Sequence, residues 1–418
     1  MAKVTEEIMY DTYVSLKRIS PSPALLAAVL ILFTALATHA QTLTTLHSFT
    51  GADGSFPEGG LVFDSQGNLN GTTVLGGAHS GGTVFKLSPS NNETVLHSFA
   101  SNVVTSICPD PRAGRDGAIP NRGLTLDSQG NLYGTTQRGG TCGLGTVFRV
   151  SSSGAETVLY RFTGGADGAQ PNPTLALDSQ GNLYGTTSRG GVAQFCCGTI
   201  FEVTSSGTTK TLYGFTGGAD GGIPLDGLIL DSSGNLVGMT IGGGAYGYGT
   251  AFKLAPDGAE TVFFSFQHTE SPVGGFALDS EGNLYGVTGN VHNGGTGGGS
   301  IFKLSSTGTK TVLYNFTGAD GDGPSGVTLD KQGNLYGTTS DGGTGGGCVP
   351  VGCGVVFKVA PNGAETVLHN FTGGADGADP FGLLTLDSQG NLYGTTATGG
   401  ISGPACTIGC GTVFKVTP

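Results

Sequence analysis

One phrase occurs seven times along this chain: L-D-S-x-G-N-L-Y-G-T-T, a glycine-rich stretch, G-T-V-F-K-L and E-T-V-L-H-S-F. The aspartate that opens the first turn of each repeat recurs about every 54 residues. These aspartates are Asp64, Asp127, Asp178, Asp231, Asp279, Asp330 and Asp387. A period of this length indicates a repeat architecture, because each unit is one supersecondary structure that buries its apolar face against its neighbours.

Each repeat contains four short runs of β-branched and aromatic residues, separated by turn residues. In the second repeat the runs are Gly123–Asp127, Asn131–Thr136, Gly145–Val150 and Glu156–Phe162. The first two runs are joined by a short link in which Gly130 can adopt a positive φ, as a hairpin turn requires. Four antiparallel strands without helical periodicity predict one propeller blade per repeat.

The two ends of the chain complement each other. A fourth-type run, Thr45–Phe49, precedes the first repeat, and the last repeat stops after its third run, Gly411–Val416. We therefore predict an all-β, seven-bladed β-propeller of four-stranded antiparallel blades, in which the N-terminal strand pairs with the C-terminal blade and closes the ring. An open solenoid is disfavoured, because it would need polar capping repeats and none is visible.

The first 40 residues lie outside the repeat. Lys17 and Arg18 precede an apolar stretch from Ala24 to Ala37, and small residues follow before Gln41. This layout predicts a secretory signal peptide over residues 1–40 and a single propeller domain over residues 41–418. The apolar stretch is short for a membrane span, so a retained anchor is the weaker alternative, and we expect no span in the mature chain.

Composition excludes some function classes. The net charge is −12, and removal of the first 40 residues leaves it unchanged. Such a chain repels phosphate backbones, which disfavours nucleic-acid binding. Tryptophan is absent, which lowers the odds of a lectin that stacks sugars on exposed indole rings.

Eight cysteines occur in a chain that we expect to be exported, where disulfides persist. The spacing favours four disulfides, which are Cys348–Cys353, Cys406–Cys410, Cys108–Cys142 and the vicinal pair Cys196–Cys197. The alternative is a zinc site made of four thiolates from the C-x4-C and C-x3-C loops. Export favours the disulfides, so we predict no metal centre.

In a propeller the second–third and fourth–first links emerge on one face, and these links carry the long insertions and all the cysteines. We expect any ligand site on this face or at the mouth of the central channel. The fourth–first links also share the phrase D-G-x-x-P, with acids at Asp53, Asp116, Asp167, Asp220, Asp320 and Asp376. A ring of these acids would attract Ca²⁺ or basic groups of a partner, but Asp-Gly is also common turn chemistry. The turn interpretation is favoured, because each loop offers one carboxylate and Ca²⁺ needs several oxygens.

Polar residues that break the repeat are the other candidates for a binding site. They include His268, Glu270 and His292. The sequence does not assemble an acid–base pair from them, and it predicts no catalytic residue.

The repeat units Leu126–Thr136 and Gly145–Phe148 resemble the Gloeobacter/Verrucomicrobium-type (GloVer) tandem repeat, and the resemblance covers roughly Thr42 to Pro418. It implies an exported bacterial β-propeller and brings no established activity. Some members carry a C-terminal sorting segment, for which this chain has no counterpart after Val416.

Taken together, these features predict a secreted or periplasmic, monomeric, non-enzymatic propeller without a cofactor. Its loop-bearing face would bind a protein or glycan partner. Two alternatives stay open. One is an extracellular hydrolase or lyase acting at the channel mouth, and the other is a structural component of the envelope or matrix.

Overall fold

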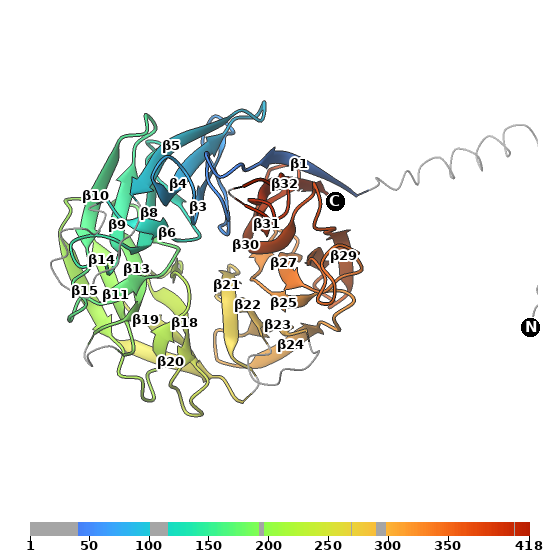
Figure 1. The fold of residues 1–418 in the computed structure, drawn as a ribbon. Coiled ribbons are helices and arrows are strands. Elements are labelled where there is room, and N and C mark those ends of the chain that lie inside the picture. The colour runs from blue at the N-terminus through green and yellow to red at the C-terminus, as the bar shows by residue number, and fades with distance from the viewer. Residues whose placement is uncertain (1–40, 101–115, 192–195, 269, 290–297, 405) are drawn as a thin grey trace, which may run out of the picture. The chain divides into compact units, whose positions relative to one another are not determined.

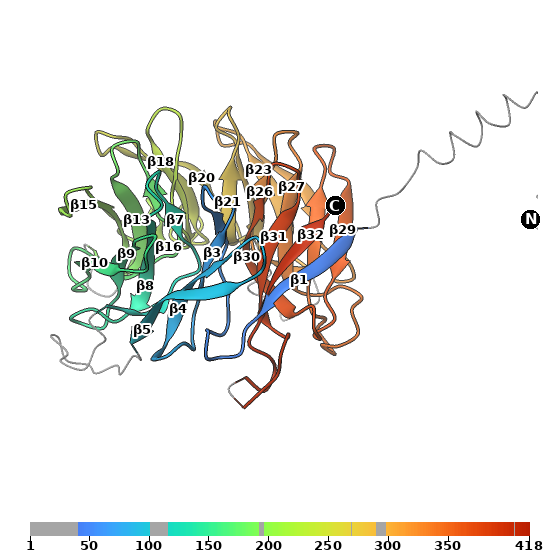
Figure 2. The same cartoon turned by 90° about the horizontal axis from the view of Figure 1, so that it is seen from above.

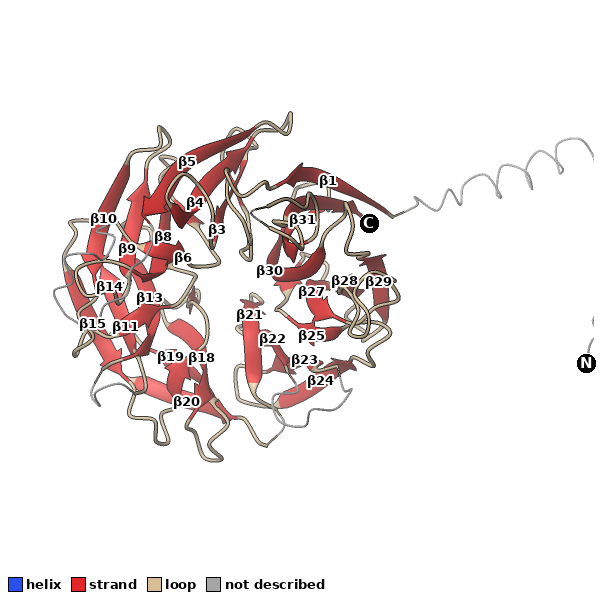
Figure 3. Ribbon diagram, viewed as in Figure 1, coloured by secondary structure: helices blue, strands red, loops and turns tan. Residues whose placement is uncertain are grey.

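Each repeat folds into one twisted antiparallel sheet whose strands follow one another in chain order (Figure 1). The computed structural model of the chain describes residues 41–100, 116–191, 196–268, 270–289, 298–404 and 406–418. Seven sheets stand around a central axis as the blades of a propeller, and the described residues contain no helix (Figure 3). The predicted all-β, seven-bladed propeller is confirmed. Residues Gln41–Pro418 form one compact unit.

The two middle strands of every blade are almost fully buried, because a neighbouring blade covers each face. The second strands are β3 (Leu69–Thr73), β8 (Leu132–Arg138), β13 (Leu183–Arg189), β18 (Leu236–Gly242), β22 (Leu284–Thr288), β27 (Leu335–Asp341) and β31 (Leu392–Thr398). The third strands are β4 (Ser80–Leu87), β9 (Thr146–Val150), β14 (Thr199–Val203), β19 (Thr250–Leu254), β23 (Ser300–Leu304), β28 (Val355–Val359) and β32 (Thr412–Thr417).

The outer strand of each blade is the fourth run of the repeat. These strands are β5 (Glu93–Ala100), β10 (Glu156–Arg161), β15 (Thr209–Gly214), β20 (Glu260–Ser265), β24 (Lys310–Asn315), β29 (Glu365–Asn370) and, in the last blade, β1 (Thr42–Ser48). The inner strands nearest the axis are β2 (Val62–Phe63), β7 (Thr125–Leu126), β12 (Ala176–Leu177), β17 (Ile229–Leu230), β21 (Pro272–Leu278), β26 (Thr328–Leu329) and β30 (Ala378–Leu386).

The inner strand departs from the sequence prediction in four blades. The D-G-x-x-P phrase was expected to be a turn, but its last three residues form a short additional strand that pairs with the far end of the second strand. These short strands are β6 (Ala118–Pro120), β11 (Ala169–Pro171), β16 (Gly222–Pro224) and β25 (Asp322–Pro324). The inner edge of each of these blades is therefore split, and the segment between its two halves faces the propeller axis.

The N-terminal strand lies in the same sheet as the C-terminus. Strand β1 is antiparallel to β32, with Thr42 opposite Thr417 and Ser48 opposite Thr412. This pairing gives β30, β31 and β32 the outer strand that their own repeat lacks. Figure 2 shows β1 and β32 side by side at the edge of the molecule.

In the middle of every blade, a repeated glycine of the second strand packs against a repeated phenylalanine of the third strand. The glycine of Y-G-T-T lies directly opposite the phenylalanine of T-V-F, as Gly238 does opposite Phe252. A Cβ at Gly238 would lie 2.5 Å from the Cζ atom of Phe252. The ring therefore covers the glycine, an arrangement that stabilises a strand at a residue with no side chain of its own to pack.

The same phenylalanine also joins neighbouring blades. At each of the seven junctions, the phenylalanine that ends the outer strand of one blade meets the third-strand phenylalanine of the next, with ring centroids 5.0–5.5 Å apart and the rings edge to face. The pairs are Phe49–Phe85, Phe99–Phe148, Phe162–Phe201, Phe215–Phe252, Phe266–Phe302, Phe316–Phe357 and Phe371–Phe414. Almost all of these rings are fully buried. Edge-to-face pairs add about 0.5–1.5 kcal/mol to the apolar area that they bury.

Three of the four predicted disulfides lie within the described residues: Cys196–Cys197, Cys348–Cys353 and Cys406–Cys410. The zinc alternative fails, because the four sulfur atoms that it requires are paired in two of these disulfides. Cys142 is also disulfide-bonded, and its predicted partner Cys108 lies outside the described residues. The part of the chain that the structure describes offers no helix able to cross a membrane.

We predict that the Phe252→Ala substitution lowers the free energy of unfolding by about 3–5 kcal/mol, because it empties a buried space that two blades share. Chemical denaturation monitored by circular dichroism measures the loss. The matched control is Val312→Ala on the outer strand β24, where the side chain is 46% exposed and the expected change is within about 0.5 kcal/mol. Equal losses in the two variants would contradict a junction held by its phenylalanine rings.

Candidate functional site

A cavity of about 560 Å³ lies on the propeller axis, and all seven blades contribute to its wall. In every blade its lining comes from the segment between a proline and the first core residue of the inner strand, and in six blades that proline ends the D-G-x-x-P phrase. In chain order these segments read E-G-G, N-R-G, N-P-T, L-D-G, V-G-G, S-G and F-G-L. The blades are nearly identical where they pack against one another, and they differ in the segments that face this cavity.

The fold holds the lining segments at their start. The residue before the proline has a positive φ although it is not glycine in five blades, as at Ile223 and Asp379. In four of these blades its backbone N–H donates to a carbonyl in the second–third loop of the preceding blade. Three of the acceptors are disulfide cysteines: Cys410 for Phe56, Cys197 for Ile223 and Cys353 for Asp379. The disulfide loops therefore brace the cavity wall, and such strained residues often lie near functional sites.

An ion pair stands at the wall of the cavity. The guanidinium group of Arg122 donates to the Glu58 carboxylate from both Nε, at 2.8 Å, and Nη2, at 2.7 Å. The same guanidinium lies 4.1 Å from the centre of the Phe381 ring. Three blades thus fix this side chain in one place, which is the geometry that favours stacking of arginine on an aromatic face.

Asp226 is the second charged residue of the cavity wall. Its Oδ1 accepts hydrogen bonds from the backbone N–H of Gly227 at 2.7 Å and from the Thr174 hydroxyl at 3.4 Å. Burial raises the pKa of the Asp226 carboxyl above its usual value, and these bonds and the positive charge of Arg122 only partly oppose the rise. No described residue donates to Oδ2, which leaves that oxygen available to a ligand.

More carboxyl groups stand beside the cavity wall. Asp322 and Asp341 face each other across the β25–β27 pair. Burial raises the pKa of Asp379, and the negative charges of Asp341 and Glu58 raise it further. The electrostatic environment on this side of the axis is therefore acidic.

The remaining wall is largely apolar. Leu61, Leu225 and Val273 line it, and Leu383 enters from the last blade. Leu383 fits because its neighbours have no side chain: a Cβ at Gly275 would lie 2.7 Å from its Cγ atom. A pocket of this size with apolar walls and a few fixed polar groups is typical of small-molecule sites.

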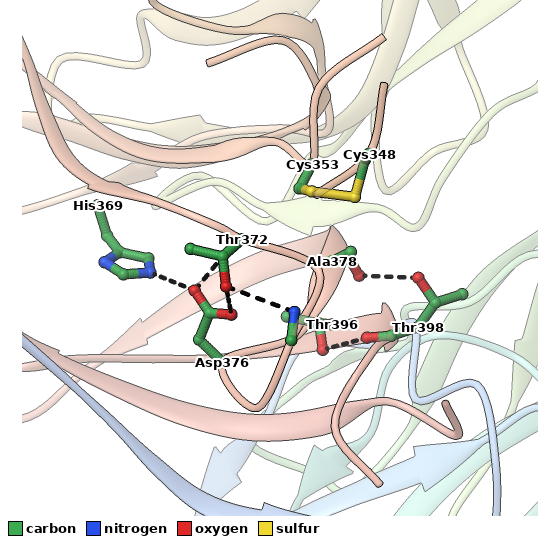
Figure 4. The surroundings of a disulfide bond; sticks show 9 residues. Cys348, Cys353, His369, Thr372, Asp376, Ala378, Thr396 and Thr398 are labelled. Atoms are coloured by element: carbon green, nitrogen blue, oxygen red, sulfur yellow. Dashed lines mark hydrogen bonds and ion pairs between the residues drawn. A yellow bond between two sulfur atoms is a disulfide. The ribbon is translucent and has the colours of Figure 1, made fainter. Parts of the chain in front are cut away.

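The six D-G-x-x-P aspartates belong to six different blades and do not line the cavity. Each accepts a hydrogen bond from the preceding outer strand, through the ring of His47, His97, Tyr160, Tyr213, Tyr314 or His369. Five of them also accept from a threonine at the start of the link. Figure 4 shows one such group, in which Asp376 binds both His369, at 3.1 Å, and Thr372. These contacts support the turn interpretation of the phrase.

The candidates that break the repeat lie elsewhere. Glu270 forms a 3.0 Å ion pair with Lys310 at the start of outer strand β24. The His268 ring packs edge to face on Tyr248, with centroids 5.0 Å apart. Neither residue lines the cavity, and His292 lies outside the described residues.

A second carboxyl group adjoins the link aspartate at four junctions. It belongs to the first residue of the next outer strand, which is Glu93, Glu156, Glu260 or Glu365, and in each case Oε1 is buried without a hydrogen-bond partner among the described residues. In the fifth blade the link acid is Glu270 and the equivalent strand residue is Lys310. The acid pairs of four junctions therefore correspond to an acid and a base in the fifth blade. At the acid pairs, burial and the charge of the link aspartate raise the pKa of the strand glutamate.

One of these groups also has the donor types of a metal site. The ligand atoms of His47, Asp53 and Glu93 all lie within 4.8 Å of one another. Imidazole and carboxylate are common zinc ligands. Tyrosine replaces the histidine at equivalent junctions and makes the same hydrogen bond to aspartate, as Tyr213 does to Asp220 at 3.1 Å. The repeated pattern therefore favours a structural role.

We predict that the acid pairs make stability depend on pH. Burial, together with the negative charge of Asp220, raises the pKa of Glu260 to about 7. A raised carboxyl pKa stabilises the fold fully below the unfolded value, near 4.5, and this stabilisation is lost as pH rises through about 7. The Glu260→Gln variant, which mimics the protonated acid, should therefore lose less thermal stability than the parent between about pH 5 and pH 8.

Thermal denaturation across that pH range measures the difference. The exposed Glu281 provides the control, because Glu281→Gln should follow the parent curve. Parallel curves for Glu260→Gln and the parent would rule out a proton held at this junction.

The sequence carries a signal for Glu58, Arg122 and Asp226 that the sequence-based prediction did not use. That prediction favoured polar residues that break the repeat in the long links. These three residues depart from the repeat pattern inside a segment of near-constant length. Their convergence from the first, second and fourth blades depends on the ring, so no local pattern in the sequence brings them together.

The fold and the cavity define a β-propeller with a candidate ligand site on its axis. The chain belongs to the Gloeobacter/Verrucomicrobia repeat family, whose sequence profile matches residues 104–290 and 263–418. No curated protein matches the sequence significantly.

Several solved propellers are similar in structure. A streptogramin B lyase is 15% identical, with a TM-score of 0.58 over 90% of this chain and 97% of its own. Virginiamycin B lyase from Staphylococcus aureus is 14% identical, with a TM-score of 0.58 over 90% of this chain and 99% of its own. PorZ, a surface component of the type-IX secretion system of Porphyromonas gingivalis, is 13% identical, with a TM-score of 0.51 over 88% of this chain and 47% of its own. At these identities the similarity shows the fold alone.

Proposed function

We propose that this protein is an exported, non-enzymatic binding propeller whose ligand site is the axial cavity. The observation that carries the proposal is the contrast between constant blades and variable lining segments. Residues that repeat serve the packing of the blades, as the phenylalanine pairs do. Two lining segments carry the charged residues Arg122 and Asp226, and Glu58 of the first blade binds Arg122.

Export is supported by the three disulfides, because such bonds persist in oxidising compartments. All three disulfides brace the start of a lining segment, through the carbonyls of Cys197, Cys353 and Cys410. Reduction would therefore loosen the cavity wall. This coupling fits a site that operates outside the cytoplasm.

Binding is favoured over catalysis by the way the charged groups are used. Arg122 is neutralised by Glu58, and Glu270, the acid first considered for a site, is neutralised by Lys310 at a blade junction. The second candidate is a hydrolase or lyase, because the Asp226 carboxyl lies in the cavity wall, where one of its oxygens could reach a substrate. Chemical conversion of a bound compound would distinguish the two.

We predict that filling the cavity abolishes binding. Leu225→Trp places an indole among the lining residues, whereas Ile223→Trp, on the same link, changes a side chain that is 43% exposed. The full chain and both variants are dialysed against one mixture of small aromatic and aliphatic amines, alcohols and carboxylates, and retained compounds are identified by mass spectrometry. The parent and Ile223→Trp should retain the same compounds, and Leu225→Trp should lose them. Retention of the same set by Leu225→Trp, or of nothing by the parent, would refute the cavity as a binding site.

A further inference from the structure

The charges at the cavity wall do not cancel. Arg122 is the one cation among its described lining residues, and Glu58 already binds it through two nitrogens. Asp226 has no such partner among the described residues, and both hydrogen bonds to its carboxyl group go to Oδ1. An acid with one free oxygen therefore stands in a largely apolar cavity.

Asp226 is half-buried, and a carboxylate that is partly removed from water without a counter-ion is costly, so a cation that enters the cavity gains more there than at the surface. Asp322, Asp341 and Asp379 beside the cavity add negative potential that would attract the same cation and oppose an anion. The walls made by Leu61, Leu225 and Val273 offer no partner to a second polar group. The complementary ligand has one positive group and an apolar body.

We propose that the axial cavity binds an organic ammonium compound with an apolar body, and that its ammonium group donates to Oδ2 of Asp226. This inference rests on the proposed function and names the class of ligand. The volume of about 560 Å³ is within the usual range for small-molecule sites, so the body can be as large as one or two rings. Phe381 also lines the cavity, with Arg122 stacked on its ring, and supplies an aromatic surface.

Three probes with the same aromatic body test the inference: phenethylamine, 2-phenylethanol and 3-phenylpropionate. Calorimetric titration of the full chain should give the tightest binding for the amine. The Asp226→Asn variant should weaken amine binding by about tenfold to a hundredfold, because it removes a charge-assisted hydrogen bond. It should leave binding of the alcohol unchanged.

Two further variants test whether amine binding depends on the negative charge at position 226. Asp226→Glu keeps the charge and should keep the preference for the amine. Asp257→Asn removes an exposed charge in a turn of the fourth blade, and it should behave as the parent. Thermal denaturation verifies that each variant is folded.

The outcomes separate the ligand class from the site. Tighter binding of the alcohol or the propionate, or an amine affinity that Asp226→Asn leaves unchanged, overturns the ammonium inference. If that binding is still lost in Leu225→Trp, the cavity remains the binding site. If the amine does not bind at concentrations up to about 10 mM, the ammonium inference also fails. The dialysis against the wider mixture then decides whether the cavity is a binding site.

Discussion

The edge-to-face contact between two phenylalanine rings is the interaction on which this molecule depends, because it recurs at every junction around the axis. One ring ends an outer strand and the other lies in the third strand of the next blade, as Phe215 and Phe252 do. A blade on its own would expose the apolar faces of its middle strands, so no blade is a stable unit without two neighbours. At one junction the outer-strand ring is Phe49, which follows strand β1. The first residues of the domain therefore complete the same set of contacts as the interior repeats.

Polar groups at the junctions follow from the same packing. The link aspartate is held by the aromatic or histidine side chain of one blade, and at four junctions it lies next to a carboxyl group of the following blade. The fifth blade replaces this acid pair by Glu270 and Lys310, and the Lys310 ammonium also lies 5.3 Å from the centre of the Phe302 ring. A buried charge needs a partner or a proton. The fifth blade uses a partner, and the raised pKa of the equivalent glutamates, such as Glu260, favours a proton at the acid pairs.

Within each repeat the strands pack the blades and the lining segment faces the cavity, so a binding function can evolve in the lining segments. Substitutions in the strands would disturb two blades at once, because each middle strand is covered on both faces. A lining segment has a braced start and leads into a core residue, while the residues between face open space. Glu58, Arg122, Asp226 and Phe381 occupy such positions in four blades. The scaffold can therefore accept different side chains at the cavity wall without a change in the packing of the blades.

The sequence by itself determined the number of blades, the order of strands within each blade and the pairing of three disulfides. These properties depend on residues that are close in the chain or that recur with the repeat. The split of the inner strand at Ile223 was missed, because the positive φ of this residue accompanies a hydrogen bond to Cys197 of the neighbouring blade, which no local propensity reveals. The cavity, the ion pair between Glu58 and Arg122 and the unpartnered oxygen of Asp226 were decided by the tertiary structure. They join segments that are a repeat or more apart in the chain, and only the ring brings those segments to one axis.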